Sequence, residues 1–297
     1  MKKYLLLSSL FFLFTASVSL PAQDLVFQTF KDTRVINSHS VETLPKRKLD
    51  IRIGHRFGDL AGDRGGTQTF FGLENASDVL IGGEYGFTDR LTAGIYRAKG
   101  AGSLASGTPG LRQLLNLIGK YRILHQKEDG SMPISLTVLG VATMSTAKRI
   151  ETNPDIINNF PEFSHRLAYA GQLLIAHKFS DGFSLQIIPS YVHRNLVAFE
   201  DDNGIFSMGF ASRIQISKVF GLIVDGTFPF SEMRTAANGF HPAIGVGLEF
   251  ETGGHVFQIN FTNATAIMET DYIPYTTSDW LEGEFRLGFT VSRTFNL

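Results

Sequence analysis

The sequence predicts an all-β fold, a single antiparallel transmembrane β-barrel of about twelve strands. Three observations support this prediction. Apolar and polar residues alternate through a series of segments of about ten residues, the length of a membrane-spanning strand. The connections between these segments are alternately short and long. The chain ends inside such a segment, on a face rich in aromatic residues.

The N-terminus has the pattern of a secretory signal peptide. Lys2 and Lys3 precede an apolar run over residues 4–20, and small residues follow around Ala22. The run contains serines and a threonine and is short for a membrane anchor of about 20 residues, so cleavage after Ala22 or Gln23 is favoured over retention. We therefore assign the chain to a signal peptide, an N-terminal segment and a barrel domain, at residues 1–22, 23–47 and 48–297.

Composition narrows the classes of function. No stretch after the signal peptide supplies the roughly 18 consecutive apolar residues of a transmembrane helix. The absence of cysteine excludes disulfides, a thiolate zinc site and a lipid-modified N-terminal cysteine. The chain has 27 Lys and Arg against 28 Asp and Glu. Without Lys2 and Lys3 the balance is 25 against 28, a net charge of three negative, which gives no reason to expect nucleic acid as a partner.

The predicted strands follow one another from residue 49 to the C-terminus. In the first, Ile51 and Ile53 share one face while Asp50 and Arg52 take the other, as expected between lipid and lumen. The twelve strands are expected, in order, at residues 49–57, 79–87, 91–96, 115–123, 134–142, 166–179, 183–191, 206–216, 222–230, 244–250, 257–261 and 285–297.

The connections between these strands carry independent information. Five are short, at residues 88–90, 125–131, 180–182, 217–220 and 251–254. Six are longer and polar, at residues 58–77, 98–111, 145–164, 195–204, 231–241 and 263–283. Barrels of the outer membrane have short periplasmic turns and long extracellular loops, and an even number of strands returns the C-terminus to the periplasm. The pattern therefore predicts an exported protein of the outer membrane.

A soluble β-sandwich or a non-membrane barrel would also alternate apolar and polar residues. The length of the strands, the strict alternation of short and long connections and the aromatic final strand all oppose it. That final strand resembles the C-terminal signal recognised by the barrel assembly machinery, although the chain ends in Leu297 with Phe295 two residues earlier. The expected partners are the lipid of the outer membrane and, during biogenesis, that machinery.

Three segments carry a resemblance to a known family. They are TFKDTRVINSHSVETLP at residues 29–45, LDIRIGHRFGD at residues 49–59 and FFGLENASDVLIGGEYGFTDRLTAGIYR at residues 70–97. The chain resembles an uncharacterised family of single-chain outer-membrane β-barrels whose members carry similar segments. The likeness is specific over roughly the first third of the chain. It implies the fold and the location, and the family has no assigned activity.

The sequence offers no convincing catalytic or metal site, so we predict neither an enzyme nor a cofactor. Serine hydrolases and surface proteases occur on barrels of this size, and a serine nucleophile needs a histidine base within reach. His39 and Ser40 are adjacent, but neighbours in an extended segment point in opposite directions. His55, His177 and His193 lie in apolar rows near strand ends, where interfacial rings are expected, and no two of them alternate on one strand.

Charged residues on the polar faces of the strands are the candidates for the lumen lining. An interior of both signs can hold water or pair internally, and twelve strands lie between the filled eight-stranded barrel and the open 16-stranded one. A closed ion-pair network and a narrow polar conduit both remain open at this point. The candidates are Asp50, Arg52, Arg56, Glu84, Lys120, Arg122, Arg166, Arg213, Asp225, Glu249, Glu284 and Arg286.

The segment at residues 23–47 is mostly polar with scattered apolar positions. It is either a free periplasmic tail or a plug in the lumen, where Arg34, His39 and Glu42 could pair with lumen charges; its mixed composition, unlike a disordered linker, favours the plug. The function predicted is a narrow channel or transporter for small polar solutes. The alternative is a closed structural or surface-binding barrel that acts through its extracellular loops.

Overall fold

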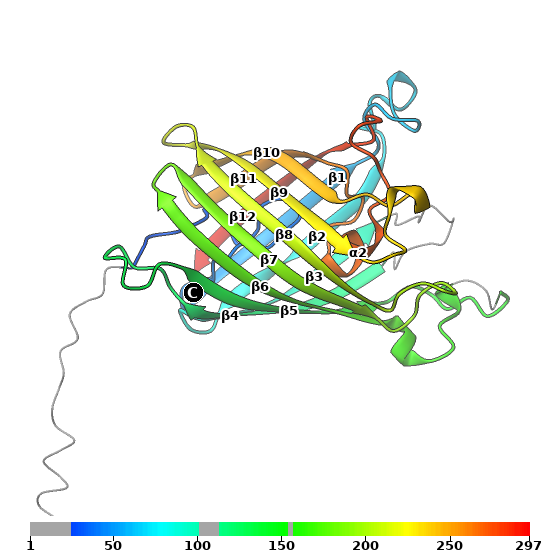
Figure 1. Ribbon diagram of the computed structural model, residues 1–297, viewed down its shortest axis with the longest axis horizontal. Coiled ribbons are helices and arrows are strands. Elements are labelled where there is room, and N and C mark those ends of the chain that lie inside the picture. Colours follow the sequence, from blue (N-terminus) through cyan, green and yellow to red (C-terminus); the bar gives the residue numbers. More distant parts are fainter. Residues whose placement is uncertain (1–24, 101–112, 154–156) are drawn as a thin grey trace, which may run out of the picture.

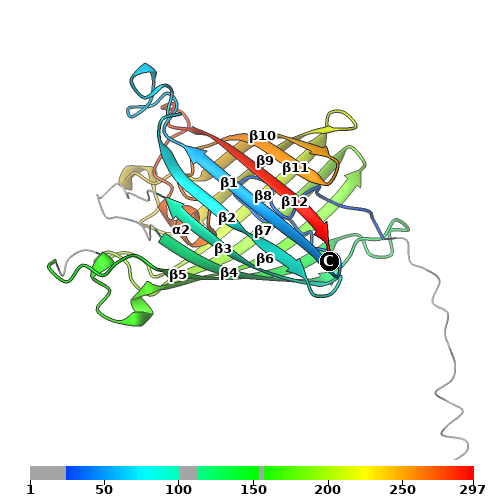
Figure 2. The same ribbon diagram turned by 180° about the vertical axis from the view of Figure 1, so that it is seen from behind.

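The computed structural model describes residues 25–100, 113–153 and 157–297, which form one closed antiparallel barrel. Each strand pairs with the strands before and after it in the chain, and β1 closes the ring on β12 (Figure 1; Figure 2). The predicted all-β, twelve-stranded fold is confirmed. The predicted signal peptide, residues 1–22, lies outside the described residues.

The strands have the length and tilt of a membrane barrel (Figure 1). Their bounds are β1 Lys48–Phe57, β2 Ala76–Gly86, β3 Leu91–Gly100, β4 Gln113–Leu124, β5 Ser135–Ser145, β6 Leu167–Ser180, β7 Phe183–Arg194, β8 Gly204–Gln215, β9 Phe220–Phe230, β10 Ala243–Thr252, β11 His255–Thr262 and β12 Arg286–Asn296. The described parts of the connections carry the α-helix α2 Glu269–Tyr275 and the short 3-10 helices η2 Thr67–Thr69, η3 Ile157–Asn159, η4 Phe163–Arg166 and η5 Ala236–Asn238. Among the described residues, no helix is long and apolar enough to span a bilayer.

Short and long connections alternate around the barrel, so one end carries turns and the other carries loops. We call them the turn end, where the C-terminus lies beside the start of β1, and the loop end (Figure 2). Two loops are shorter than the sequence indicates. β3 runs on to Gly100 because Lys99 pairs with Val79, and β8 begins at Gly204 because that residue pairs with His193.

The two faces of each strand differ in burial as the alternation requires. In β1, Ile51 and Ile53 point outward and are exposed, whereas Asp50 and Arg52 point into the lumen and are buried. Aromatic rings from neighbouring strands meet near the turn end, with Phe250 stacked on Phe257 at 5.0 Å between ring centroids. Such rings at strand ends are typical of the girdle at a membrane interface.

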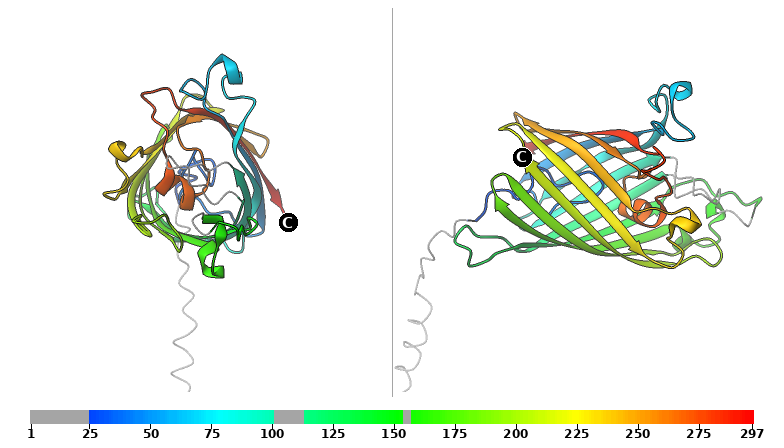
Figure 3. Two further views of the ribbon diagram at one scale, coloured as in Figure 1. Left: turned by 90° about the vertical axis from the view of Figure 1, so that its right-hand side faces the viewer. Right: turned by 45° about the horizontal axis from the view of Figure 1, so that its top comes forward.

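The lumen is filled by chain that enters from both ends, and these insertions cross the interior in the end-on view (Figure 3). Residues 25–46, the N-terminal plug, enter at the turn end and fold back, with an antiparallel bridge between Arg34 and His39. Residues 263–285, the α2 plug, enter at the loop end and carry the buried helix α2. The sequence predicts this last stretch as an extracellular loop without a helix. The inward fold differs from that expectation because apolar side chains of α2 and the lumen wall bury one another.

We expect Leu173→Arg to reduce the free energy of unfolding by about 2–4 kcal/mol, because Leu173 faces outward at the middle of β6. Phe179→Arg, near the turn end of the same strand, should cost about 0–1 kcal/mol. Chemical unfolding of the protein in lipid vesicles measures both values. Equal costs at the two depths would contradict a lipid-facing outer wall.

Candidate functional site

The tip of the N-terminal plug is bound by one carboxylate of the wall. Asp225 of β9 accepts backbone N–H groups from Ile36, Asn37 and Ser38 at 3.3, 2.6 and 2.8 Å. It also accepts the Asn37 side-chain amide at 2.8 Å. Hydrogen bonds to an ionised group are stronger than neutral ones, and these converge on a tight turn closed by Val35 N–H and the Ser38 carbonyl at 2.8 Å. Asp225 therefore fixes the deepest point of the plug.

A lysine of the wall holds the two limbs of the plug together. Lys120 of β4 is fully buried and donates to the backbone carbonyls of Thr33, Ser40 and Glu42 at 2.7, 3.2 and 3.3 Å. Thr33 belongs to the inward limb and the other two to the returning limb. One ammonium group thus satisfies three carbonyls that the lumen would otherwise leave unpaired.

An ion pair and a hydrogen bond fasten the inward limb to β1 and β2. Arg52 of β1 donates to Asp32 of the plug at 2.9 Å, and lies 3.3 Å from Asp50 of its own strand. Glu84 of β2 accepts from the Tyr96 hydroxyl at 2.8 Å and the Thr33 hydroxyl at 3.3 Å. All of these side chains are buried, and buried charges persist only when they are paired.

The two plugs meet at the Arg34 guanidinium. Arg34 donates to the Ile267 carbonyl at 3.1 Å and to Glu269 of α2 at 3.1 Å. It also lies 2.8 Å from His39 Nε2. Burial, followed by the positive charge of Arg34, lowers the pKa of His39 well below its usual range. Because a guanidinium only donates, His39 Nε2 accepts a hydrogen bond from Arg34, which requires the neutral imidazole.

Arg56 of β1 makes a second connection between the plugs. It donates to the Asn37 side-chain carbonyl at 2.6 Å, to the Ala264 carbonyl at 3.3 Å and to the Ala266 carbonyl. Asp78 of β2 accepts the Ile267 backbone N–H at 2.8 Å. Neither plug can therefore move far without breaking contacts of the other.

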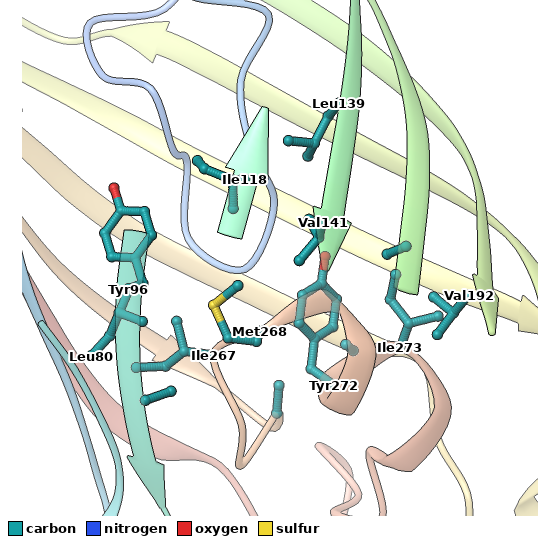
Figure 4. Packing of buried hydrophobic residues seen from close by; sticks show 14 of the residues in the cluster. Leu80, Tyr96, Ile118, Leu139, Val141, Val192, Ile267, Met268, Tyr272 and Ile273 are labelled. Atoms are coloured by element: carbon teal, nitrogen blue, oxygen red, sulfur yellow. The ribbon is translucent and has the colours of Figure 1, made fainter. Parts of the chain in front are cut away.

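The lumen wall has two chemically different parts. The charged groups that hold the N-terminal plug come from β1, β2, β4 and β9. Between the barrel ends, the lumen faces of β5–β8 carry no charged side chain, and we call this part the uncharged wall. Helix α2 packs against β5, β6, β7 and β9, with Tyr272 beside Val141 and Ile273 beside Val192 (Figure 4).

The α2 plug is anchored at the loop end by arginine and tyrosine. Arg194 of β7 pairs with Asp271 at 3.1 Å and stacks on the Tyr275 ring, 4.3 Å from its centroid. Arg234 lies 5.0 Å from the same ring, and the Tyr275 hydroxyl donates to Asp201 at 3.2 Å. These contacts tie the helix to two further loops.

Two cavities open at the turn end, on either side of residues 28–31 of the N-terminal plug. One has about 370 Å³ and is mainly basic, with Lys178, Arg213 and Lys218 in its lining. The other has about 250 Å³ and is mainly acidic, with Asp50, Glu42 and Glu251. Both are lined by the plug, so solvent at the turn end reaches it directly.

The structure places most of the predicted lumen residues inside the barrel. Nine are buried in the lumen, namely Asp50, Arg52, Arg56, Glu84, Lys120, Arg213, Asp225, Glu249 and Arg286. Arg213 and Glu249 pair with each other at 2.7 Å, and Arg286 donates to Ser278 of the α2 plug at 3.0 Å. Half-buried Arg122 pairs with Glu42 of the N-terminal plug at 3.3 Å, and that carboxylate also accepts the Thr29 N–H at 2.8 Å.

Two of the predicted lumen residues lie elsewhere. Arg166 ends η4 before β6 starts and donates to the Ala147 carbonyl at the loop end. Glu284 precedes β12 and accepts the Asp279 N–H within a loop. The expectation of a lumen position is wrong for both, because the strands start after these residues and the alternation does not extend to them.

Several residues of the site have no signal in the sequence. Asp32, Arg194, Glu269, Asp271 and Tyr272 all hold the plugs in place. Four of them lie in segments outside the strands, where an alternating pattern gives no direction for a side chain. Arg194 extends β7 beyond its predicted end.

The histidines also have defined positions. His39 and Ser40 are buried in the N-terminal plug, where the Ser40 hydroxyl donates to the Asp32 carbonyl at 2.5 Å. His55 stacks on Phe289 on the outer face, 5.5 Å between ring centroids. In the part of the chain that the structure describes, no cluster of His, Asp and Glu has the arrangement of a metal site.

Comparison with known proteins matches residues 30–295 to the family described as "Membrane bound beta barrel domain (DUF5777)". The chain belongs to this family. A comparison of the sequence with curated proteins finds no match.

The chain is also similar to several β-barrels of known structure, all at low sequence identity. The NanC porin has 11% identity and a TM-score of 0.49, covering 84% of this chain and 100% of that chain. The KdgM porin has 7% identity and a TM-score of 0.49, covering 84% and 99%. An outer membrane channel from Pseudomonas putida F1 has 14% identity and a TM-score of 0.44, covering 86% and 98%.

We expect Asp225→Asn to loosen the N-terminal plug, because a neutral amide cannot accept the four donors that the carboxylate accepts. Loss of bonds to an ionised group should weaken plug retention by about 1.5–3 kcal/mol. Hydrogen exchange at residues 33–40 measures the change. Asp129→Asn is the control, because its exposed carboxylate bonds to Ser131 of its own turn and not to residues 33–40. Equal exchange in both variants would refute the assignment.

We expect Glu269→Ala, at the loop end, to increase protease cleavage of residues 25–46 at the turn end, because Glu269 is held by Arg34 of the N-terminal plug. Removing one partner leaves Arg34 buried and uncompensated, which costs about 3–5 kcal/mol. The double variant Arg34→Ala and Glu269→Ala should be less than additive. Strict additivity would show that the plugs are independent.

Proposed function

We propose that this protein is an outer-membrane conduit for small polar solutes, and that its two plugs hold it shut in the described state. The turn end then faces the periplasm and the loop end faces the outside. Export by the predicted signal peptide and insertion by the barrel assembly machinery, which reads the aromatic final strand ending at Phe295 and Leu297, complete the proposal. The protein catalyses no reaction in this scheme.

The observation that carries the proposal is the polar contact between the N-terminal plug and the wall. Asp225, Lys120, Arg52 and Arg56 hold it by hydrogen bonds and ion pairs. Buried ion pairs often stabilise a fold less than apolar packing of similar volume. Stability alone therefore does not account for so many polar contacts between the plug and the wall. Polar groups on both surfaces can instead exchange their mutual hydrogen bonds for bonds to water and solute when the plug leaves.

The size of the barrel fits this view. Eight strands enclose only their own side chains, whereas 16 leave an aqueous channel. The twelve strands of this barrel enclose two additional segments of chain. Removal of those segments would therefore leave a lumen of intermediate width.

A closed barrel that binds a partner through its loops is the alternative. One observation favours it: Phe70 and Phe71, in the loop between β1 and β2, are 61% and 47% exposed. Both have a left-handed backbone, with φ of 48° and 55°, which is unusual for bulky side chains and is often retained for a function.

Deletion of residues 23–45 distinguishes the two. We expect the shortened barrel to remain folded and to show higher ion conductance in planar bilayers than the intact protein, because the lumen beside the charged wall becomes free. A folded deletion variant without conductance would refute the conduit and favour the closed barrel.

A reversible lock provides the matched control in the full-length chain. A Cβ on Gly245 would lie 2.8 Å from Ile36 Cγ2, so Ile36→Cys with Gly245→Cys can join the plug tip to β10. The same Cβ would lie 2.8 Å from Asp225 Oδ1, so the Gly245→Cys single variant is measured beside the pair. The chain has no other cysteine. Openings of the intact protein should disappear when this pair is oxidised and return on reduction.

A further inference from the structure

The uncharged wall resembles a small-molecule site that is occupied by the protein's own chain. Ligand sites are mostly apolar with a few placed polar groups. The wall presents Leu139, Val141, Leu174, Ile188 and Val192 to the lumen, all buried in one cluster with α2. Figure 4 shows Leu139, Val141 and Val192 of this cluster with Tyr272 and Ile273 of the helix.

Polar atoms of this wall lack partners among the described residues. Gln172 donates to the Ser190 hydroxyl at 3.0 Å and Gln186 to the His39 carbonyl at 2.9 Å. The side-chain carbonyl oxygens of these two glutamines and the Ser207 hydroxyl are buried without a hydrogen bond in the described part of the chain. Gln172 and Ser207 belong to one cross-strand row, because each pairs with Ser190. A buried acceptor without a protein partner can accept a hydrogen bond from a bound molecule.

Helix α2 is held in the lumen by its surroundings more than by its own sequence. It has seven residues, contains Pro274 and has no side-chain cap at its start. Isolated helices of fewer than about 12 residues are marginal in water, and proline removes a backbone donor. Displacement from the wall would therefore unwind it, and a competing ligand need not overcome intrinsic helix stability.

The residues of α2 show which chemistry the wall accepts. Tyr272 and Ile273 pack on the wall, whereas both carboxylates find arginines elsewhere, Glu269 at Arg34 and Asp271 at Arg194. Arg194 borders the wall on β7 but is already paired with Asp271. The wall itself offers no charge to pair with an ion, and an unpaired ion in such a place is costly.

We propose that the uncharged wall is the solute-binding face of the conduit, that α2 occupies it in the shut state, and that the solute is a small uncharged molecule with one apolar face and hydroxyl or amide donors. This inference rests on the proposed function and names the class of solute. The apolar face replaces Tyr272 and Ile273, and the donors satisfy Gln172, Gln186 and Ser207.

The chain contains one tryptophan, which reports on α2 without labelling. Trp280 follows α2, donates to the Ile244 carbonyl at 3.0 Å and stacks on Phe285 at 4.6 Å between ring centroids. Displacement of the helix would disturb both contacts. Trp280 emission is therefore measured in the intact protein during titration with phenyl β-glucoside, methyl β-glucoside and phenyl β-glucuronide.

We expect a saturable change in emission with phenyl β-glucoside and a much weaker response to the other two, which lack the ring or add a charge. Gln172→Leu should weaken binding of phenyl β-glucoside about threefold to tenfold through loss of a hydrogen bond. Ser207→Ala is a milder second variant, should Gln172→Leu fail to fold. Asn260→Leu replaces a buried amide on β11, away from the uncharged wall, and should bind as the unchanged protein does.

Equal responses to the methyl and phenyl glucosides would contradict the claim that the solute has an apolar face. Tighter binding of the glucuronide would contradict the claim that the solute is uncharged. No response to any probe, in a protein whose plug deletion conducts ions, would refute this inference and leave the conduit intact. Absence of conductance in the folded deletion variant would remove the conduit, and this inference with it.

Discussion

A charged side chain that points into the lumen of this barrel must be either paired or hydrated. The rest of the structure depends on this constraint. Arg52, Lys120 and Asp225 lie on strands too far apart around the ring to neutralise one another. Ionised groups buried without partners cost several kcal/mol each. The N-terminal plug removes that cost by bringing Asp32, backbone carbonyls and backbone N–H groups to these three side chains.

The constraint also explains why the two plugs differ in composition. The N-terminal plug contacts the charged groups of the wall, and also Gln186 of the uncharged wall, through polar atoms. Helix α2 packs on the uncharged wall through Tyr272 and Ile273. Arg34 joins the two, because it is the cation of one plug and the partner of Glu269 in the other. Each plug thus carries side chains and backbone groups that match the part of the wall on which it packs.

The sequence predicts side-chain directions well wherever the two-residue period of a β-strand fixes them. Alternation along β1 places Arg52 inward and Ile53 outward without further knowledge, because a strand has only two faces. The same alternation does not predict where the Glu269 side chain points, since α2 has seven residues and depends on packing against strands distant in sequence. Glu284 shows the limit at a strand end, where a polar residue two positions before the first paired residue, Arg286, looks like a continuation of the pattern.

Tethering makes the shut state easy to recover. The α2 plug is joined to β11 and β12 at its two ends, and the N-terminal plug leads directly into β1. A segment tied near its site returns by an intramolecular step, with an effective concentration in the millimolar range for short flexible links. A solute that occupies the uncharged wall competes with that local concentration, so α2 would close the lumen again once the solute has passed. The weak helix propensity of α2 therefore allows a solute to displace it from the wall. Its short tethers return it to the wall soon afterwards.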